Sequence, residues 1–153
     1  MRLLSIVICI TVFSLITPAF AELDVDVIVD GLNNPWEIVF GPEGEIFFTE
    51  RDGRIWKIEN FGEAKVIETF PKSGSMEGGT LGLALHPDFK NNQKIYIYQT
   101  NLELEFFQNK VFSFTVNGDT LTDKQVVIDN IPGAPWHDGG RIKFSPDGKL
   151  YIT

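Results

Sequence analysis

Residues 38–49 read Ile-Val-Phe-Gly-Pro-Glu-Gly-Glu-Ile-Phe-Phe-Thr, a short apolar strand that enters a Pro-containing turn and leaves it as a second alternating strand. The pattern returns at 83–98 and again at 142–153. The three turns contain prolines that are 45 and 59 residues apart, at positions 42, 87 and 146. Repeats of roughly 40–50 residues built from short strands are typical of β-propeller blades. The sequence therefore predicts an all-β propeller, with about two and a half blades in this chain.

Other segments also alternate polar and apolar residues, which is the pattern of half-buried strands. We expect strands at 24–30, 36–40, 45–50, 54–59, 65–69, 81–85, 94–100, 109–116 and 124–128, and two more after Gly140. Among the four strands expected at 81–128, Asn117-Gly118-Asp119 is the strongest hairpin signal. No segment of about 12 residues shows helical periodicity. A two-sheet sandwich also uses short strands with tight turns, and it is the structural alternative.

Residues 1–21 differ from the rest of the chain. Arg2 is their only charge, an apolar run covers 3–16, and Pro-Ala-Phe-Ala ends the segment at Ala21. These features predict a secretory signal peptide that is cleaved after Ala21. The alternative is an uncleaved membrane anchor, but the apolar run is short for a span of roughly 20 residues. A lipoprotein signal is not indicated, because Ile8 precedes Cys9 where a small residue is needed.

The expected mature chain, residues 22–153, has 12 Lys and Arg against 21 Asp and Glu, a formal charge of −9, and no cysteine. The lack of cysteine excludes disulfides and Cys-ligated metal sites within 22–153. An acidic chain without a basic stripe argues against nucleic acid and anionic membranes as partners. We expect no membrane span after signal cleavage and an exported protein, periplasmic or extracellular.

Two long connections interrupt the run of strands, at 71–80 and 131–140. In a propeller such loops link the outer edge of one blade to the inner strand of the next, and they arrive near the central axis, where ligands bind. Each contains a candidate residue close to a Gly-Gly pair, Glu77 in the first and His137 in the second. Histidine can take a proton near neutral pH, and Glu77 could orient a hydroxyl. Trp136 could line a pocket for a sugar or a flat cofactor.

Composition alone leaves a purely structural role open for each of these three residues. These roles are an ordinary hydrogen bond for His137, a solvated loop charge for Glu77, and packing for Trp136. His86, the only other histidine, lies in a His-Pro-Asp turn, where we expect a structural role. Two distant histidines without cysteine do not indicate zinc. The sequence also lacks Gly-x-Ser-x-Gly, a phosphate-binding loop and a dinucleotide fingerprint.

Four stretches resemble the soluble PQQ-dependent sugar dehydrogenases, which are the glucose/sorbosone and aldose sugar dehydrogenases. They are Asn-Pro-Trp-Glu-Ile-Val-Phe at 34–40, Thr-Glu-Arg-Asp-Gly-Arg-Ile at 49–55, Glu-Gly-Gly-Thr-Leu-Gly-Leu-Ala-Leu-His-Pro-Asp-Phe at 77–89, and His-Asp-Gly-Gly-Arg-Ile at 137–142. The similarity runs from about Leu32 to Thr153. It implies a quinoprotein oxidoreductase on a six-bladed propeller, with pyrroloquinoline quinone (PQQ) over the central axis and calcium assisting it.

The resemblance also implies roles for the candidate residues. His137 matches the catalytic base, which removes the C1 hydroxyl proton of an aldose while hydride passes to the quinone. Glu77 matches a substrate-side position that is glutamine in the glucose enzymes. Trp136 stands where those enzymes have an acidic residue, which favours the broader aldose type over glucose. An aldose and an electron acceptor are therefore the expected partners.

The family holds calcium and the carboxylates of PQQ mostly with residues of later blades, so we assign no cofactor or metal ligand in this chain. Six blades need roughly 240–300 residues, so we expect this chain to be the N-terminal part of a longer protein. The strand expected at 24–30 would then close the ring against the last blade. Two other hypotheses are a non-catalytic secreted propeller that binds a protein or glycan, and an inactive truncated product.

Overall fold

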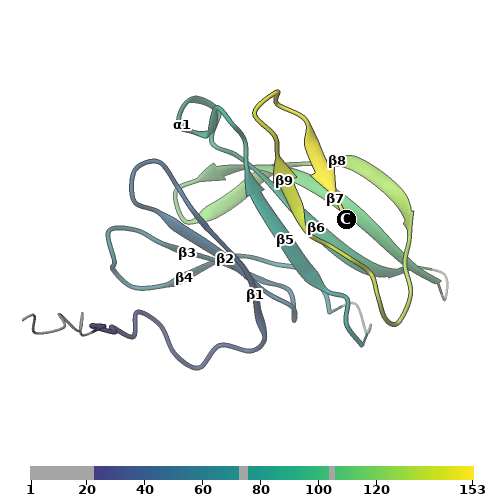
Figure 1. Cartoon of the computed structure of the whole chain (residues 1–153), viewed down its shortest axis with the longest axis horizontal. Coiled ribbons are helices and arrows are strands. Elements are labelled where there is room, and N and C mark those ends of the chain that lie inside the picture. The colour runs from purple at the N-terminus through teal and green to yellow at the C-terminus, as the bar shows by residue number, and fades with distance from the viewer. Residues whose placement is uncertain (1–22, 73–75, 104–105) are drawn as a thin grey trace, which may run out of the picture.

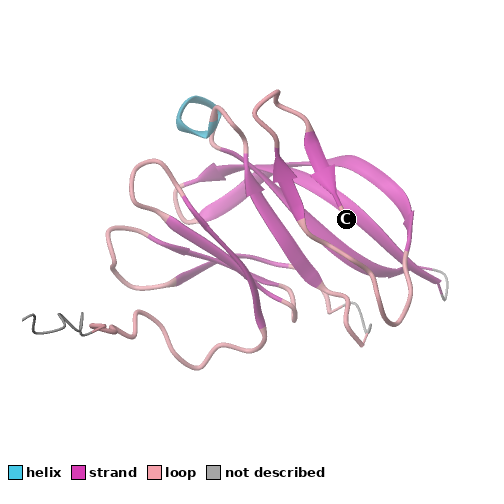
Figure 2. Cartoon of the chain, in the orientation of Figure 1, coloured by secondary structure: helices cyan, strands magenta, loops and turns pink. Residues whose placement is uncertain are grey.

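The computed structural model describes residues 23–72, 76–103 and 106–153, which are mostly strands joined by turns and loops (Figures 1 and 2). The elements are β1 (Pro35–Phe40), β2 (Ile46–Glu50), β3 (Arg54–Ile58), β4 (Lys65–Thr69), β5 (Thr80–Leu85), α1 (Phe89–Asn92), β6 (Lys94–Glu103), β7 (Phe106–Asn117), β8 (Thr120–Pro132), β9 (Ile142–Phe144) and β10 (Leu150–Ile152). They form two four-stranded sheets, in the orders β1-β2-β3-β4 and β5-β6-β7-β8, and a β9–β10 pair.

The three sheets stand next to one another through their first strands. In Figure 1, β5 lies between β1 and β9, and it contacts both. All pairings within the sheets are antiparallel between strands that are consecutive in sequence. Separate meanders that meet at their first strands are consecutive propeller blades, whereas the two sheets of a sandwich exchange strands through Greek-key connections. The prediction of an all-β propeller with about two and a half blades is confirmed.

The repeated Pro-containing turn makes the same hydrogen bond in all three sheets. The residue before each proline donates its backbone N–H across the turn: Gly41 to the Glu45 carbonyl at 2.7 Å, His86 to that of Lys94 at 2.9 Å, and Ser145 to that of Lys149 at 2.9 Å. The second turn is longer and includes α1, whose Phe89 is buried. The sequence repeat is therefore a structural repeat, and only its middle copy carries an insertion.

The strand expected at 24–30 is not formed, and residues 23–32 have no regular secondary structure. Instead, Val29 and Leu32 pack against the first sheet, on a cluster formed by Ile46, Phe48 and Ile58. A strand needs a neighbour to pair its backbone N–H and C=O groups, and none of the described sheets includes this segment. The prediction of a strand was therefore wrong, and the alternation did not produce a buried face, because Val25 and Val27 are 71% and 78% exposed.

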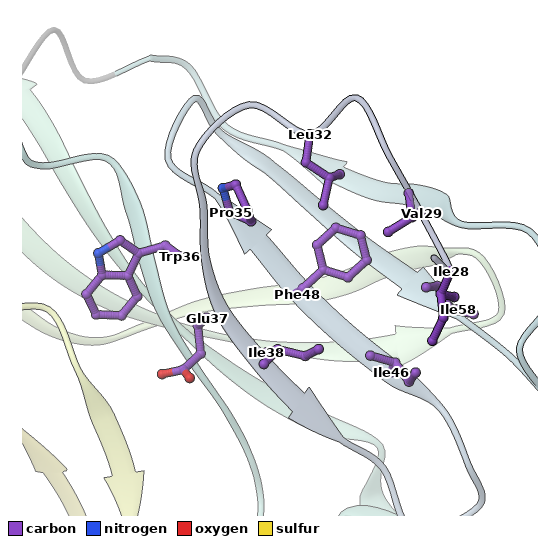
Figure 3. A pocket seen from close by; sticks show the side chains of 10 residues that line it. All are labelled: Ile28, Val29, Leu32, Pro35, Trp36, Glu37, Ile38, Ile46, Phe48 and Ile58. Atoms are coloured by element: carbon purple, nitrogen blue, oxygen red, sulfur yellow. The ribbon is translucent and has the colours of Figure 1, made fainter. Parts of the chain in front are cut away.

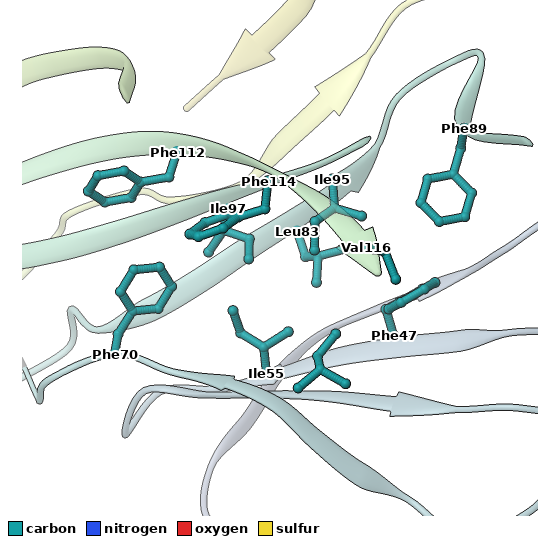
Figure 4. Close-up of a cluster of buried hydrophobic side chains, with 11 residues drawn as sticks. Phe47, Ile55, Phe70, Leu83, Phe89, Ile95, Ile97, Phe112, Phe114 and Val116 are labelled. Atoms are coloured by element: carbon teal, nitrogen blue, oxygen red, sulfur yellow. The ribbon is translucent and has the colours of Figure 1, made fainter. Parts of the chain in front are cut away.

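The main hydrophobic core lies between the first and second sheets (Figure 4). It combines side chains of both units: Phe47, Ile55, Ile67 and Phe70 from the first, and Leu83, Phe89, Ile95, Ile97, Phe112, Phe114 and Val116 from the second. Full burial of one such side chain stabilises the fold by about 1.5–3 kcal/mol. Because these residues come from both units, neither blade can bury this face without the other.

The second and third sheets approach so closely that one position of β5 requires glycine. Gly82 donates its backbone N–H to the Gly140 carbonyl at 2.9 Å. A Cβ atom on Gly82 would lie 2.3 Å from that same oxygen. Leu81, Tyr98 and Ile142 pack around the contact in a second buried cluster. The backbone of β5 therefore directly positions the segment that follows His137.

No helix within the described residues has the length and apolar character of a membrane span. The signal peptide that we expect at 1–21 lies outside the described residues.

Candidate functional site

The two long loops meet at the N-terminal end of β5. Met76 and Glu77 both donate their backbone N–H groups to the carbonyl of Pro135, each at 3.1 Å. The Oε2 atom of Glu77 accepts the backbone N–H of His137 at 3.0 Å. These hydrogen bonds join segments that are 60 residues apart in sequence. They place Glu77 and His137 side by side, so two of the residues selected from the sequence belong to one site.

His137 is exposed and has a backbone conformation that is uncommon for a residue with a side chain. Its φ is +65°, in the left-handed region. This conformation is less favourable than the right-handed one by about 1–2 kcal/mol for a non-glycine residue. Such strain persists where surrounding contacts fix it, and it is concentrated at functional sites. The imidazole is open to solvent, so a ligand can reach it.

Trp136 lies next to His137 and exposes 52% of its surface. Large aromatic side chains are usually well buried. An exposed indole offers a flat apolar face on which a ring-shaped ligand can stack. Glu77, Trp136 and His137 therefore all lie on the same pair of joined loops, and each is accessible to a ligand.

Arg51 fixes the Glu77 loop to the first sheet. Its Nη2 group donates to the Met76 carbonyl at 2.6 Å, and its own carbonyl accepts the N–H of Thr80 at 3.3 Å. Gly79 has a φ of +142°, and a Cβ atom there would lie 2.2 Å from the Arg51 carbonyl oxygen. The second glycine after Glu77 is thus required for close packing of the loop on the first sheet.

Sequence reasoning missed two residues of the second sheet that hold the second loop through Asp138. Tyr98 of β6 donates its hydroxyl to the carbonyl of Asp138 at 2.8 Å. Asn109 of β7 donates its Nδ2 group to Oδ1 of Asp138 and to the carbonyl of Pro132, both at 3.1 Å. Asn109 is 1% exposed. Because β7 contains several other polar residues, no signal in the sequence marks Asn109 as a support of this loop.

Tyr98 should make the stability of the protein depend on pH in the alkaline range. Burial, aided by the nearby Asp138 carboxylate, raises the pKa of its hydroxyl from 10.0 to about 12. The unfolded chain then loses this proton first. The free energy of unfolding should be intact below about pH 10 and fall by about 2 kcal/mol as the pH rises to about 12.

Urea unfolding at neutral and alkaline pH measures this effect. Tyr98→Phe should remove the alkaline loss, whereas Tyr151→Phe, which alters an exposed tyrosine of β10, should retain it. Equal alkaline losses in the two variants would contradict the assignment to Tyr98.

The second histidine, His86, follows the C-terminal end of β5 and is engaged in a turn. Its Nδ1 atom accepts the backbone N–H of Asp88 at 3.0 Å and lies 2.8 Å from the side-chain amide nitrogen of Asn92. Its ring stacks on Tyr96 and contacts Phe144 of the third sheet. These contacts agree with the structural role that we expect for His86.

The exposed imidazole, carboxylate and indole around His137 are groups that can contact a hydroxylated ligand. They do not form a metal site: in the described part of the chain, no three His, Asp or Glu side chains are grouped so that they could hold a cation. The carboxylates of PQQ would need cationic partners. The guanidiniums of Arg51 and Arg141 already have partners, since Arg51 donates to the Met76 carbonyl and Arg141 pairs with the Glu37 carboxylate. Neither calcium nor the PQQ carboxylates therefore fit the residues assembled here.

An apolar cavity of about 280 Å³ lies elsewhere, on the face of the first sheet that is turned away from the second. Figure 3 shows Leu32 and Val29 near Phe48, with Ile28 close to Ile58. The ten lining residues include one charged side chain, Glu37, and none of the candidate residues. We attribute this cavity to the packing of the N-terminal segment on the sheet and not to substrate binding.

Residues 32–153 match the sequence profile of the family described as Glucose / Sorbosone dehydrogenase. Quinoprotein glucose dehydrogenase B from Acinetobacter calcoaceticus is 31% identical over 145 residues, covering 86% of this chain and 30% of that protein. The PQQ-bound aldose sugar dehydrogenase from Streptomyces coelicolor has a TM-score of 0.74 and 30% identity, over 84% of this chain and 40% of its own. The apo-form of the soluble aldose sugar dehydrogenase from Escherichia coli has a TM-score of 0.73 and 26% identity, over 84% of this chain and 40% of its own.

The chain spans about a third of the length of the curated relatives it matches, with shares of 30% and 34% for two of them. The family match includes both joined loops, and therefore Glu77, Trp136 and His137.

Proposed function

Because the chain belongs to the Glucose / Sorbosone dehydrogenase family, we propose that it supplies the catalytic base and substrate-side residues of a PQQ-dependent aldose dehydrogenase. The observation that carries this proposal is the junction of the two loops, in which the carboxylate of Glu77 accepts the backbone N–H of His137. This junction joins the candidate base, beside the exposed Trp136, to a second loop that holds a carboxylate. Such a group of residues can bind and deprotonate a sugar hydroxyl.

In the proposed reaction an aldose binds with its C1 hydroxyl toward the imidazole of His137. The imidazole removes the hydroxyl proton while C1 loses a hydride, and the sugar leaves as a lactone. The chemistry that PQQ supplies when bound is acceptance of that hydride. The electrons then pass to an external acceptor. The task of His137 is therefore to hold one proton at the moment when the C–H bond breaks.

Glu77 and Trp136 are the proposed substrate-side residues. The carboxylate of Glu77 is held against the backbone of His137, so a sugar hydroxyl that approaches the imidazole comes close to it. Trp136 can stack on the apolar face of a sugar ring. An indole at this position makes no charged hydrogen bond to one particular hydroxyl, which favours acceptance of several aldoses over selectivity for glucose.

We propose that the residues which hold calcium and the PQQ carboxylates lie outside the described part of this chain. The described residues form no cluster of metal ligands, and the matched relatives extend well beyond the region that the chain covers. In this proposal the complete enzyme is a six-bladed ring whose further blades carry these ligands.

We also propose that residues 1–21 direct export to the periplasm or the outside of the cell. Their basic start, apolar stretch and Ala-x-Ala site are features of a cleaved signal peptide. The acidic remainder of the chain does not favour nucleic acid as a partner. The proposed partners are an aldose and an electron acceptor, both of which an exported enzyme would meet outside the cytoplasm.

The alternatives differ in a property that can be measured. A non-catalytic propeller that binds a protein or glycan can share the fold, because fold does not fix function. An inactive truncated product would lack neighbouring blades and bury too little surface to persist. The family match and the accessible His137 favour the enzyme. Binding of PQQ separates the enzyme from the other two, because only the enzyme has use for the cofactor.

The test is dye reduction by the full-length gene product after reconstitution with PQQ and calcium, with several aldoses as substrates. We expect turnover of more than one aldose, and loss of turnover when PQQ is omitted. A protein that binds PQQ but oxidises no aldose would contradict the proposal. Failure to bind PQQ, combined with binding of a protein or glycan, would favour the non-catalytic propeller. An insoluble or rapidly degraded protein would favour the inactive product.

A further inference from the structure

Asp138 closes the loop that contains His137. Its Oδ1 atom accepts the backbone N–H of Ala134 at 2.7 Å, so the residues between them are held in a short ring. The same oxygen accepts the Nδ2 group of Asn109 at 3.1 Å. Because Asn109 belongs to β7, the carboxylate ties the loop to a strand at the centre of the second sheet.

Tyr98 holds the same residue through its main chain. Its hydroxyl donates to the Asp138 carbonyl at 2.8 Å, and both Tyr98 and Asn109 are 1% exposed. The amide of Asn109 has one orientation, because its Nδ2 group faces two acceptors, the Asp138 carboxylate and the Pro132 carbonyl. Asp138 is therefore held by two buried side chains on the neighbouring strands β6 and β7, which are more rigid than a loop.

We propose that Asp138, held by Tyr98 and Asn109, is the positioning residue that keeps His137 in its left-handed conformation. This inference rests on the proposed function of His137 as the base. Without the Asp138 contacts the backbone at His137 would relax toward the right-handed region, which is favoured by about 1–2 kcal/mol. The imidazole would then be displaced from the C1 hydroxyl, and a displacement of about 1 Å lowers a rate by on the order of 10²-fold.

Two substitutions distinguish hydrogen-bond geometry from charge. The bonds from Ala134 and Asn109 both end on Oδ1 of Asp138, so an asparagine can keep them through its own Oδ1, whereas an alanine loses both. We expect Asp138→Ala to lower kcat by about 10- to 100-fold with KM within about threefold, and Asp138→Asn to stay within about threefold of wild type. Asp147→Ala, which removes an exposed turn carboxylate of the third sheet, should leave kcat unchanged.

Amide hydrogen exchange of the full-length protein without cofactor gives a readout that is independent of activity. The amide of Ala134 should exchange about 10-fold faster in Asp138→Ala because it loses its acceptor. The amide of His137, which donates to Glu77, should accelerate to a similar extent because the loop is no longer closed behind it. Both amides should keep wild-type rates in Asp138→Asn and Asp147→Ala. If Asp138→Ala does not fold, Tyr98→Phe removes a single hydrogen bond and should still accelerate exchange at His137 by about threefold or more.

Unchanged exchange at His137 in Asp138→Ala, or an equal loss of kcat in Asp138→Ala and Asp138→Asn, would overturn the positioning role. A wild-type protein that oxidises no aldose, while exchange at His137 still responds to Asp138→Ala, would overturn the proposed function and support the structural part of the inference. If the wild type oxidises aldoses but neither kcat nor exchange at His137 changes in Asp138→Ala, the proposed function is supported and the positioning role is overturned.

Discussion

Replacing His137 by alanine should lower kcat for aldose oxidation by about 10²–10⁴-fold, because the proton of the C1 hydroxyl loses its acceptor. KM should change little, since the proposed substrate contacts of Glu77 and Trp136 are retained. The bond that joins the loops uses the backbone N–H of residue 137 and not its side chain. The junction therefore survives the substitution, and the loss of rate reports the imidazole itself.

Steady-state kinetics of the full-length protein loaded with PQQ would measure this effect. Added imidazole should restore part of the rate of His137→Ala, because a free base can enter the space that the side chain leaves. A variant whose kcat stays within about threefold of wild type would show that another group is the base.

The matched control is His86→Ala, the same substitution at the other end of β5. It removes the acceptor for the Asp88 N–H and the ring contacts with Tyr96 and Phe144. We expect the free energy of unfolding to fall by about 1–3 kcal/mol while kcat is retained. The opposite pattern, with activity lost at His86 and kept at His137, would exchange the roles of the two histidines.

The sequence predicted the strands because their signals are local. Each Pro-containing turn lies between alternating segments, and in each the residue before the proline makes a hydrogen bond across the turn. The one wrong strand, at 24–30, has the right alternation but no partner for its backbone among the described residues. A period of two shows that a segment can form a half-buried strand, and whether it does so depends on a neighbour that the segment itself does not specify.

The candidate site was predictable only where motif residues lie in the loops themselves. Glu77 and His137 stand beside Gly-Gly pairs, which mark close packing. The support of Asp138 was not predictable, because its partners Tyr98 and Asn109 are 40 and 29 residues away in sequence. Which polar side chain faces which loop is decided by the register of β6 and β7, where Thr100 pairs with Asn109. No local pattern fixes that register.

Phe47→Ala should be the most destabilising single substitution that we propose. Phe47 in β2 has no exposed surface, and its ring packs edge-on against that of Phe89 at 5.7 Å between centroids. It belongs to the core shared by the first and second sheets (Figure 4). Truncation of a buried phenylalanine removes its transfer free energy and leaves a cavity, so we expect the free energy of unfolding to fall by about 3–5 kcal/mol.

Urea unfolding of the full-length gene product measures this loss, as a lower midpoint with an unchanged m-value. The control is Phe61→Ala, which alters a phenylalanine that is 74% exposed in the β3–β4 turn and should change stability by less than about 0.5 kcal/mol. Since each blade is stabilised mainly by its neighbours, loss of Phe47 should also loosen the first sheet against the second. Arg51 joins the Glu77 loop to that first sheet, so exchange at the Thr80 amide should accelerate as well. Equal midpoints for the two variants would show that the shared core does not hold the blades together.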